Sequence, residues 1–159
     1  MNKTVEHEIK RPMSHSEMEC YLFNLIEKVK YFNPDEIVGI NRGGMSYGTW
    51  IAHILDLPLG MYIRKGNRLM LTNESSKRLM LIDDNIISGE TFTEVKNYFD
   101  TTDYIWKFGV LFSDSIETPE VFKQQIISGT DLNYFATTVP GFYRNFVPYE
   151  RARDKNESI

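Results

Sequence analysis

The sequence lacks several features that would assign it to a secreted, membrane or nucleic-acid-binding class. Cys20 is its single cysteine, so an internal disulfide is excluded and a reducing compartment is expected. No apolar run approaches the ~20 residues that cross a bilayer, and the N-terminal MNKTVEHEIK carries acidic residues where a signal peptide has its apolar core. The 18 Lys and Arg residues are outnumbered by 22 Asp and Glu, which argues against a nucleic-acid binder. We therefore expect a soluble, cytoplasmic protein that binds neither membranes nor nucleic acid.

Length and composition predict one globular domain. The 159 residues are 42% hydrophobic and 25% charged, close to the averages for globular proteins. A chain of this length buries ~70% of its extended surface on folding, so no disulfide or structural metal is needed. We place the domain at residues 1–150 and expect the polar stretch 151–159 to fray. The histidines have no metal-ligand spacing and are interpreted as ordinary surface or core residues: His7, His15 and His53.

Strand-like and helix-like segments alternate along the chain. Short apolar runs predict strands at Glu36–Ile40, Leu59–Ile63, Leu79–Ile82, Tyr104–Phe112 and Leu132–Ala136. Apolar residues at helical spacing predict helices at Met18–Phe32, Tyr47–Leu55, Thr91–Phe99 and Thr118–Gly129, with Cys20 as a small core residue of the first. The polar segment Arg64–Lys77 is interpreted as a hairpin or a mobile loop. The alternation indicates an α/β domain with a mostly parallel sheet, which binds ligands at the carboxyl ends of its strands.

The turn that follows Ile82 has the composition of an anion site. A helix begins just after Ser88-Gly89-Glu90-Thr91, and backbone N–H groups at a helix N-terminus bind anions. Taken alone, these four residues are better explained by an ordinary helix cap. The adjacent Asp83 and Asp84 favour a ligand, because two carboxylates at the end of a buried strand are costly unless something pairs with them. Sugar hydroxyls, or a metal bound to a substrate, would pair with them.

The turn that follows Ile40 reads Asn41-Arg42-Gly43-Gly44. Its glycines allow a ligand to approach the backbone closely, and Arg42 can donate charge-assisted hydrogen bonds to phosphate oxygens. Taken alone, it is equally an ordinary turn. Together the two turns predict a site with an anion position at each end and ribose contacts between them.

Both turns resemble motifs of one known family. Leu79–Thr91 (LMLIDDNIISGET) resembles the phosphoribosyl-pyrophosphate (PRPP) motif of type I phosphoribosyltransferases, and Ile37–Gly44 (IVGINRGG) resembles the pyrophosphate loop of that family. The resemblance covers roughly Val5 to Glu150 and is closest to the xanthine–guanine and hypoxanthine branch, which has a similar Pro- and aromatic-rich C-terminal stretch. It implies a single-domain, mostly parallel sheet flanked by helices, with a small C-terminal hood segment, and a homodimer.

The resemblance also implies a role for individual residues. Asp83 and Asp84 contact the ribose hydroxyls, and reach Mg²⁺ indirectly through ribose or water. The 5-phosphate lies in the loop formed by Asn85, Ile87, Ser88, Gly89, Glu90 and Thr91. Pyrophosphate is bound by Arg42, Gly43 and Arg64, with a cis peptide before Gly43 left open. The base contacts Ile87, and the aromatic residues Phe142, Tyr143 and Phe146 either stack on it or simply pack on the sheet.

In the implied reaction a nucleobase displaces pyrophosphate from PRPP, with Mg²⁺ as cofactor. The first candidate for this base is an oxopurine. Three departures from the pattern of this family keep alternatives to an active enzyme open. Ile87 stands where the oxopurine branch usually has an Asp and cannot transfer a proton. The stretch Lys65–Lys77 is shorter than the usual hood loop, and Glu90 adds a carboxylate to the phosphate loop. The alternatives are a PRPP- or nucleotide-binding regulatory protein without catalysis, and a scaffold with an empty site.

Overall fold

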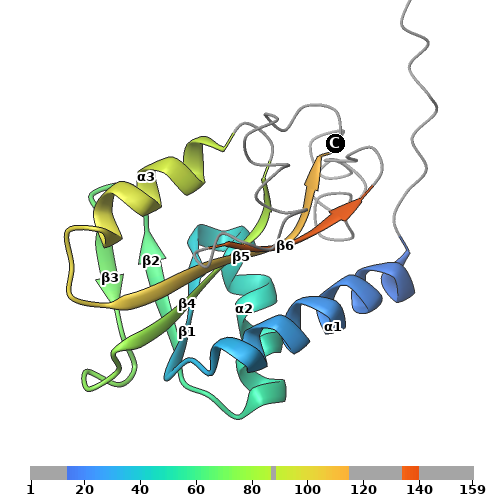
Figure 1. Ribbon diagram of the computed structural model, residues 1–159, viewed down its shortest axis with the longest axis horizontal. Coiled ribbons are helices and arrows are strands. Elements are labelled where there is room, and N and C mark those ends of the chain that lie inside the picture. Colours follow the sequence, from blue (N-terminus) through green and yellow to red (C-terminus); the bar gives the residue numbers. More distant parts are fainter. Residues whose placement is uncertain (1–13, 87–88, 115–133, 140–159) are drawn as a thin grey trace, which may run out of the picture.

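One mixed sheet forms the centre of the molecule (Figure 1). The computed structural model describes residues 14–86, 89–114 and 134–139. In these ranges the helices are α1 (His15–Phe32), α2 (Asn41–Leu55) and α3 (Glu90–Phe99). The strands are β1 (Glu36–Ile40), β2 (Leu59–Ile63), β3 (Arg68–Met70), β4 (Arg78–Ile86), β5 (Ile105–Asp114) and β6 (Tyr134–Val139). Their order is β3-β2-β1-β4-β5-β6, and every neighbouring pair is parallel except β2 with β3. The predicted α/β fold with a mostly parallel sheet is confirmed.

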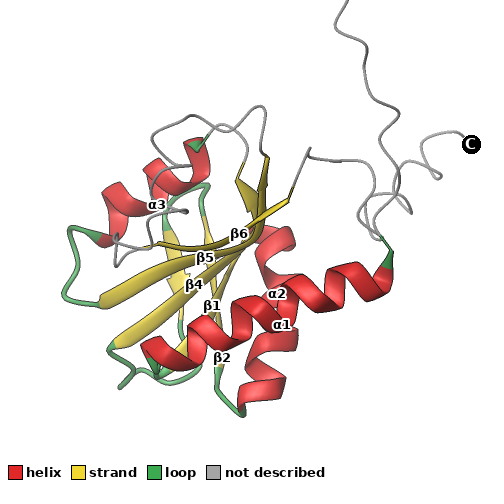
Figure 2. Ribbon diagram, turned by 45° about the vertical axis from the view of Figure 1, so that its right-hand side comes forward, coloured by secondary structure: helices red, strands yellow, loops and turns green. Residues whose placement is uncertain are grey.

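The helices cover both faces of the sheet, with α1 and α2 on one side and α3 on the other (Figure 2). Successive strand residues point to opposite faces, so each strand supplies both cores. Met80 and Ile82 pack with the apolar residues of α1 and α2, whereas Leu79 and Leu81 pack with those of α3. This double burial explains why the strands read as continuous apolar runs rather than as alternating ones.

Capping residues set the ends of α1. The Ser14 side chain accepts from the backbone N–H of Glu17, whose own side chain accepts from the Ser14 N–H, so the pair forms a capping box. At the other end Asn33 adopts a left-handed conformation with φ of 54°. The guanidinium of Arg78 donates to the Phe32 carbonyl at 2.8 Å and lies over the Phe32 ring. These contacts fasten α1 to the beginning of β4.

Several sequence predictions are corrected by the structure. β4 continues to Ile86 instead of ending at Ile82, because its last residues pair with β5 in register. The acid pair therefore lies in a strand and not in a turn. α2 begins at Asn41, directly after β1, so the glycine turn is the first turn of a helix. Cys20, expected in the core, is exposed.

The segment Arg64–Lys77 contains a tight hairpin between β2 and β3, which resolves the two predicted possibilities in favour of the hairpin. The hydroxyl of the buried Tyr62 donates a hydrogen bond to Oδ1 of Asn67 and so holds the turn, in which Asn67 adopts a φ of 48°. The predicted helix Thr118–Gly129, the hood segment and the tail 151–159 lie outside the described residues.

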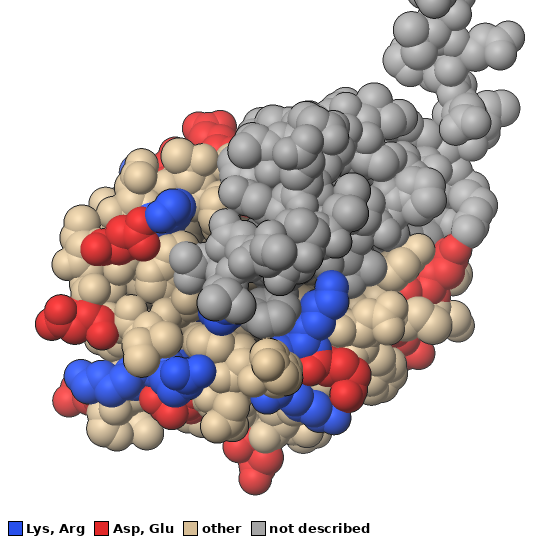
Figure 3. Space-filling view, viewed as in Figure 1, with Lys and Arg blue, Asp and Glu red and all other residues tan. Residues whose placement is uncertain are grey.

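The described surface carries both signs of charge. On the face shown in Figure 3, Lys and Arg side chains alternate with Asp and Glu side chains over the described elements. This distribution accompanies the formal net charge of −4. Among the described residues, we find no helix with the length and apolar character that a bilayer span requires.

Glu36, at the start of β1, holds the chain that leads into β4. Its carboxylate is fully buried and accepts from the backbone N–H of Thr72 at 2.6 Å, the N–H of Asn73 at 3.2 Å and the hydroxyl of Ser76 at 2.8 Å. Three donors from one short segment replace the water that the carboxylate loses. The ordering of this segment therefore depends on the charge of Glu36.

We predict that Glu36→Gln lowers the free energy of unfolding by about 2–4 kcal/mol, because an amide keeps one acceptor oxygen and turns a donor toward other donors. Urea unfolding measures the change. Glu74→Gln, an exposed change in the same segment, is the matched control and should alter stability by less than ~0.5 kcal/mol. Equal stabilities of the two variants would contradict this role of Glu36.

Candidate active site

The predicted site lies where the strand order reverses. From β1 the chain moves to β2 on one side, and it later returns as β4 on the other side of β1. The carboxyl ends of these three neighbouring strands lead into the start of α2, Arg64 and the start of α3. Open α/β sheets bind ligands in the crevice at such a switch point. The residues that sequence analysis singled out at the two turns are thus brought to one edge of the sheet.

The two turns meet at a contact between Asp84 and Gly43. A Cβ placed on Gly43 would lie 2.7 Å from Oδ2 and 3.0 Å from Oδ1 of Asp84, so only glycine leaves room for this carboxylate. A Cβ on Gly44 would lie 2.0 Å from the carbonyl oxygen of Ile82. The first glycine therefore accommodates a side chain of the site, whereas the second lets α2 pack on the backbone of β4.

Asp83 occupies an unfavourable environment for a charge. Its side chain is buried, and its Oδ1 accepts from the backbone N–H of Asp84 at 2.9 Å. Burial, followed by the neighbouring Asp84 charge and a hydrogen bond between the two carboxyl groups, raises the pKa of Asp83 well above its ordinary value. The backbone hydrogen bond and the charge of Arg64 oppose the shift. An acid pair held in this way is typical of a site that awaits a polar ligand or a cation.

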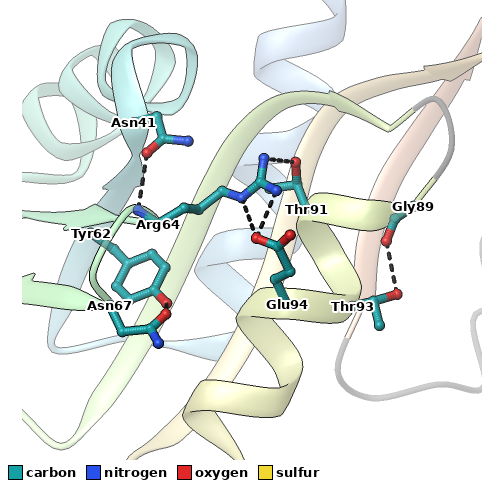
Figure 4. A network of polar contacts seen from close by, with 8 residues as sticks. All are labelled: Asn41, Tyr62, Arg64, Asn67, Gly89, Thr91, Thr93 and Glu94. Atoms are coloured by element: carbon teal, nitrogen blue, oxygen red, sulfur yellow. Dashed lines mark hydrogen bonds and ion pairs between the residues drawn. The ribbon is translucent and has the colours of Figure 1, made fainter.

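Arg64 connects the two turns (Figure 4). Its backbone N–H donates to Oδ1 of Asn41 at 3.1 Å, and Asn41 itself adopts φ of 50° at the start of α2. Its guanidinium reaches α3, where Nη1 donates to the Thr91 hydroxyl at 2.9 Å. Nε and Nη2 lie 2.8 Å and 2.7 Å from Oε2 of Glu94. The end of β2 is thereby tied to both helices of the site.

The two helices that begin at the site differ from α1 in their N-termini. Ile40 precedes α2 and Gly89, with φ of 83°, precedes α3, and neither provides a side-chain cap hydrogen bond. The first N–H groups of a helix have no partner within the helix. Two such N-termini at one edge of the sheet form anion positions with a favourable helix dipole.

The remaining predicted residues are distributed around this edge. Asn85 is half-buried at the end of β4, Glu90 is exposed at the start of α3 and Arg42 is exposed in the first turn of α2. The peptide before Gly43 is trans, which decides the question that the resemblance left open. Residues outside the described ranges are Ile87, Ser88, Phe142, Tyr143 and Phe146.

Sequence analysis missed two members of the site, Asn41 and Glu94. Asn41 carried a signal, since it directly follows a buried strand and Asn tolerates left-handed backbone better than most residues. Glu94 carried none, because an acid on the exposed face of a helix has no distinctive sequence pattern.

The donor chemistry of the acid pair is compatible with Mg²⁺. The described residues contain no group of three or more His, Cys, Asp or Glu side chains that could hold a metal. Mg²⁺ commonly binds through one or two carboxylates together with substrate phosphates and water. The carboxyl oxygens of Asp83 and Asp84 are of the type that Mg²⁺ binds, and a nearby cation would reduce the repulsion between the two groups.

Solved structures with related folds give the comparison. The chain is similar to a purine phosphoribosyltransferase from Pyrococcus horikoshii Ot3, with 21% identity, a TM-score of 0.54 and coverage of 80% of this chain and 89% of that chain. For the Helicobacter pylori xanthine-guanine-hypoxanthine phosphoribosyltransferase the values are 14%, 0.62, 91% and 95%. For a hypothetical protein from Neisseria gonorrhoeae with bound ppGpp they are 13%, 0.63, 91% and 93%. These similarities show that the chain has the fold of type I phosphoribosyltransferases. No family model and no curated protein matches it.

Substitutions of Gly43 and Gly44 in α2 are expected to have different effects. Gly43→Ala should fold, because its new methyl group displaces a side-chain carboxylate, but it should weaken PRPP binding at least about tenfold. Gly44→Ala should lower the free energy of unfolding by at least about 2 kcal/mol, because its methyl group meets the backbone of β4.

Gly48→Ala is the matched control in the same helix, where the nearest atom to an added Cβ is 3.4 Å away. It should leave PRPP affinity unchanged and should not reduce stability. Calorimetric titration and urea unfolding measure the two quantities. Unchanged PRPP binding by Gly43→Ala would contradict the assigned contact.

The raised pKa of Asp83 predicts that the free energy of unfolding depends on pH. Because the folded state raises the pKa of Asp83, ionisation destabilises the folded state as pH rises through that pKa. The variant Asp83→Asn keeps the acceptor for the Asp84 N–H and carries no charge. Its stability should equal that of the wild type below about pH 3.8 and exceed it increasingly between that pH and the raised pKa of Asp83, by up to about 1.4 kcal/mol per pH unit, with a constant excess above that pKa. Urea unfolding across this range measures the difference, and a constant difference at every pH would rule this explanation out.

Proposed function

We propose that this protein is a magnesium-dependent phosphoribosyltransferase, which transfers the ribose 5-phosphate of PRPP to a nucleobase and releases pyrophosphate. The observation that carries the proposal is the contact between Asp84 and Gly43. It joins the acid pair of β4 to the glycine turn of α2. A ligand held by both needs hydroxyl groups at the carboxylate and anions at the neighbouring helix N-termini. PRPP has this arrangement.

The start of α3 serves the 5-phosphate. Gly89 turns the chain with positive φ, and the following backbone N–H groups have no side-chain cap. Backbone donors of this type hold an anion without a change in protonation. Glu90 is exposed at the start of α3, so its carboxylate need not point toward the anion position. Ser88 is assigned to the same phosphate by the resemblance.

The acid pair serves the ribose. The half-buried Asp84 accepts hydrogen bonds from the ribose hydroxyls, and Asp83 shares a hydrogen bond with Asp84 and fixes its position. In the transition state the ribose carries developing positive charge, which nearby carboxylates stabilise electrostatically. Mg²⁺, when bound, supplies charge neutralisation for the phosphate oxygens that leave.

The start of α2 serves the leaving pyrophosphate. Gly43 offers its N–H without a side chain in the way, and Arg42 places a cation beside it at the surface. The protein therefore contributes positioning and charge stabilisation, with no covalent intermediate. An oxopurine is the first candidate base, from the resemblance to the xanthine–guanine and hypoxanthine branch, and Ile87 with Phe142, Tyr143 and Phe146 is assigned to it. The homodimer and the cytoplasmic location remain predictions.

A second candidate is binding of PRPP or a nucleotide without turnover. The turn between β2 and β3 is a tight hairpin, held by the hydrogen bond from the Tyr62 hydroxyl to Asn67. It is too short to close over the reacting atoms, as a longer loop at this position would. Ile87 cannot transfer a proton. A protein of the same fold from Neisseria gonorrhoeae holds ppGpp, so the fold also accommodates a nucleotide.

The proposal predicts release of pyrophosphate when the protein is incubated with PRPP, Mg²⁺ and a panel of purine and pyrimidine bases. Asp84→Asn should reduce PRPP affinity at least about tenfold, because it loses charge-assisted hydrogen bonds. Its melting temperature should be unchanged or raised, since one of two adjacent like charges is removed. Glu74→Gln, with the same charge change at an exposed position, should behave as the wild type.

PRPP binding without turnover on any base would favour the second candidate. If Asp84→Asn binds PRPP normally, the assignment of Asp84 to the ribose is wrong.

A further inference from the structure

Arg64 is directed toward α3, although its backbone lies beside α2. The N–H of Arg64 is bound by Asn41, at the helix start that serves pyrophosphate in the proposed function. Its side chain leaves this position and reaches Thr91 and Glu94 (Figure 4). Each nitrogen of the guanidinium contacts one of these two α3 residues. The charge of Arg64 therefore lies at the opposite helix from the one that its backbone contacts.

The contacts leave the guanidinium able to bind an anion. A guanidinium has five N–H donors, and the contacts with Thr91 and Glu94 engage three of its N–H groups in the described part of the chain. Glu94 takes the edge formed by Nε and Nη2, so one N–H of Nη1 and one of Nη2 have no partner among the residues that the structure describes. The planar fork makes these donors well suited to phosphate.

The same bond orients Thr91. A hydroxyl group has one donor hydrogen and two acceptor lone pairs. Because Arg64 donates to the Thr91 oxygen, the hydroxyl hydrogen must point elsewhere, and it is available to donate to an anion at the start of α3. Arg64 and Thr91 thus present donors together.

We propose that Arg64 binds the 5-phosphate together with Thr91, instead of the pyrophosphate to which the resemblance assigned it, and that Glu94 is a positioning residue for the guanidinium. The proposal rests on the proposed function, because it distributes the residues of that site between the two ends of PRPP. It assigns Arg42 as the arginine of the pyrophosphate end and Arg64 as the arginine of the 5-phosphate end.

Two ligands that each correspond to one end of PRPP distinguish the two possible roles of Arg64. Calorimetric titration of the full chain with ribose 5-phosphate, and separately with magnesium pyrophosphate, measures the two ends independently. In Arg64→Gln the affinity for ribose 5-phosphate should fall at least about tenfold, while that for pyrophosphate should fall less than about threefold. Arg68→Gln is the matched control, since it removes the same charge from an exposed position on β3 of the same hairpin. It should weaken both ligands by less than about threefold.

The opposite pattern, with pyrophosphate affinity lost and ribose 5-phosphate affinity kept, would overturn the assignment, as would equal losses for both ligands. Failure of the wild type to bind either of these two ligands would overturn the proposed function as well. Arg64→Lys keeps the charge but loses the fork, and it provides the same comparison if Arg64→Gln does not fold. Its loss should again be larger for ribose 5-phosphate.

A double-mutant cycle tests the role of Glu94. Glu94→Gln should change ribose 5-phosphate affinity at least about threefold in the wild-type background and less than about 1.5-fold in the Arg64→Gln background, because Glu94 acts through Arg64. The effect on pyrophosphate should be small in both backgrounds. Equal effects of Glu94→Gln in the two backgrounds would show that Glu94 is not a positioning residue for Arg64.

Discussion

The site depends on the approach of the Asp84 carboxylate to the Cα of Gly43. The parallel pairing of β1 with β4 brings the two residues to the same edge of the sheet, and the missing side chain of Gly43 leaves the space. Gly44 allows the same approach for the backbone, since α2 packs directly on the carbonyl of Ile82. The acid pair lies in β4, α2 begins directly after β1 and Arg64 directly follows β2, so the carboxyl ends of three neighbouring strands position them.

Two buried carboxyl groups have different roles: one stabilises the fold and the other belongs to the candidate site. Glu36, at the amino end of β1, receives three hydrogen bonds from one segment and orders the approach to β4. Asp83, toward the carboxyl end of β4, receives one backbone N–H, lies beside another carboxylate and has a raised pKa. A satisfied carboxylate stabilises the fold, whereas an acid pair under repulsion costs stability that a bound cation or ligand would return. The two ends of the sheet are therefore specialised differently.

Sequence reasoning predicted the parts of the molecule that follow local rules. Buried strands such as Glu36–Ile40 and the α/β class come from hydrophobic periodicity and the alternation of elements, and the structure confirms them. It failed where tertiary pairing decides the outcome: β5 extends β4 through the acid pair, and α2 absorbs the glycine turn. The direction of the Arg64 side chain and the role of Glu94 depend on a contact between distant segments, which no local pattern encodes.

The most direct test of the central claim is a crystal structure of the complex with PRPP and Mg²⁺. The account predicts one ligand that spans both helix starts, with an Asp84 oxygen about 3 Å from a ribose hydroxyl. The 5-phosphate should lie at the N-terminus of α3 and the pyrophosphate against the N–H of Gly43. A complex in which PRPP binds elsewhere, with the contact between Asp84 and Gly43 remote from the ligand, would contradict the account.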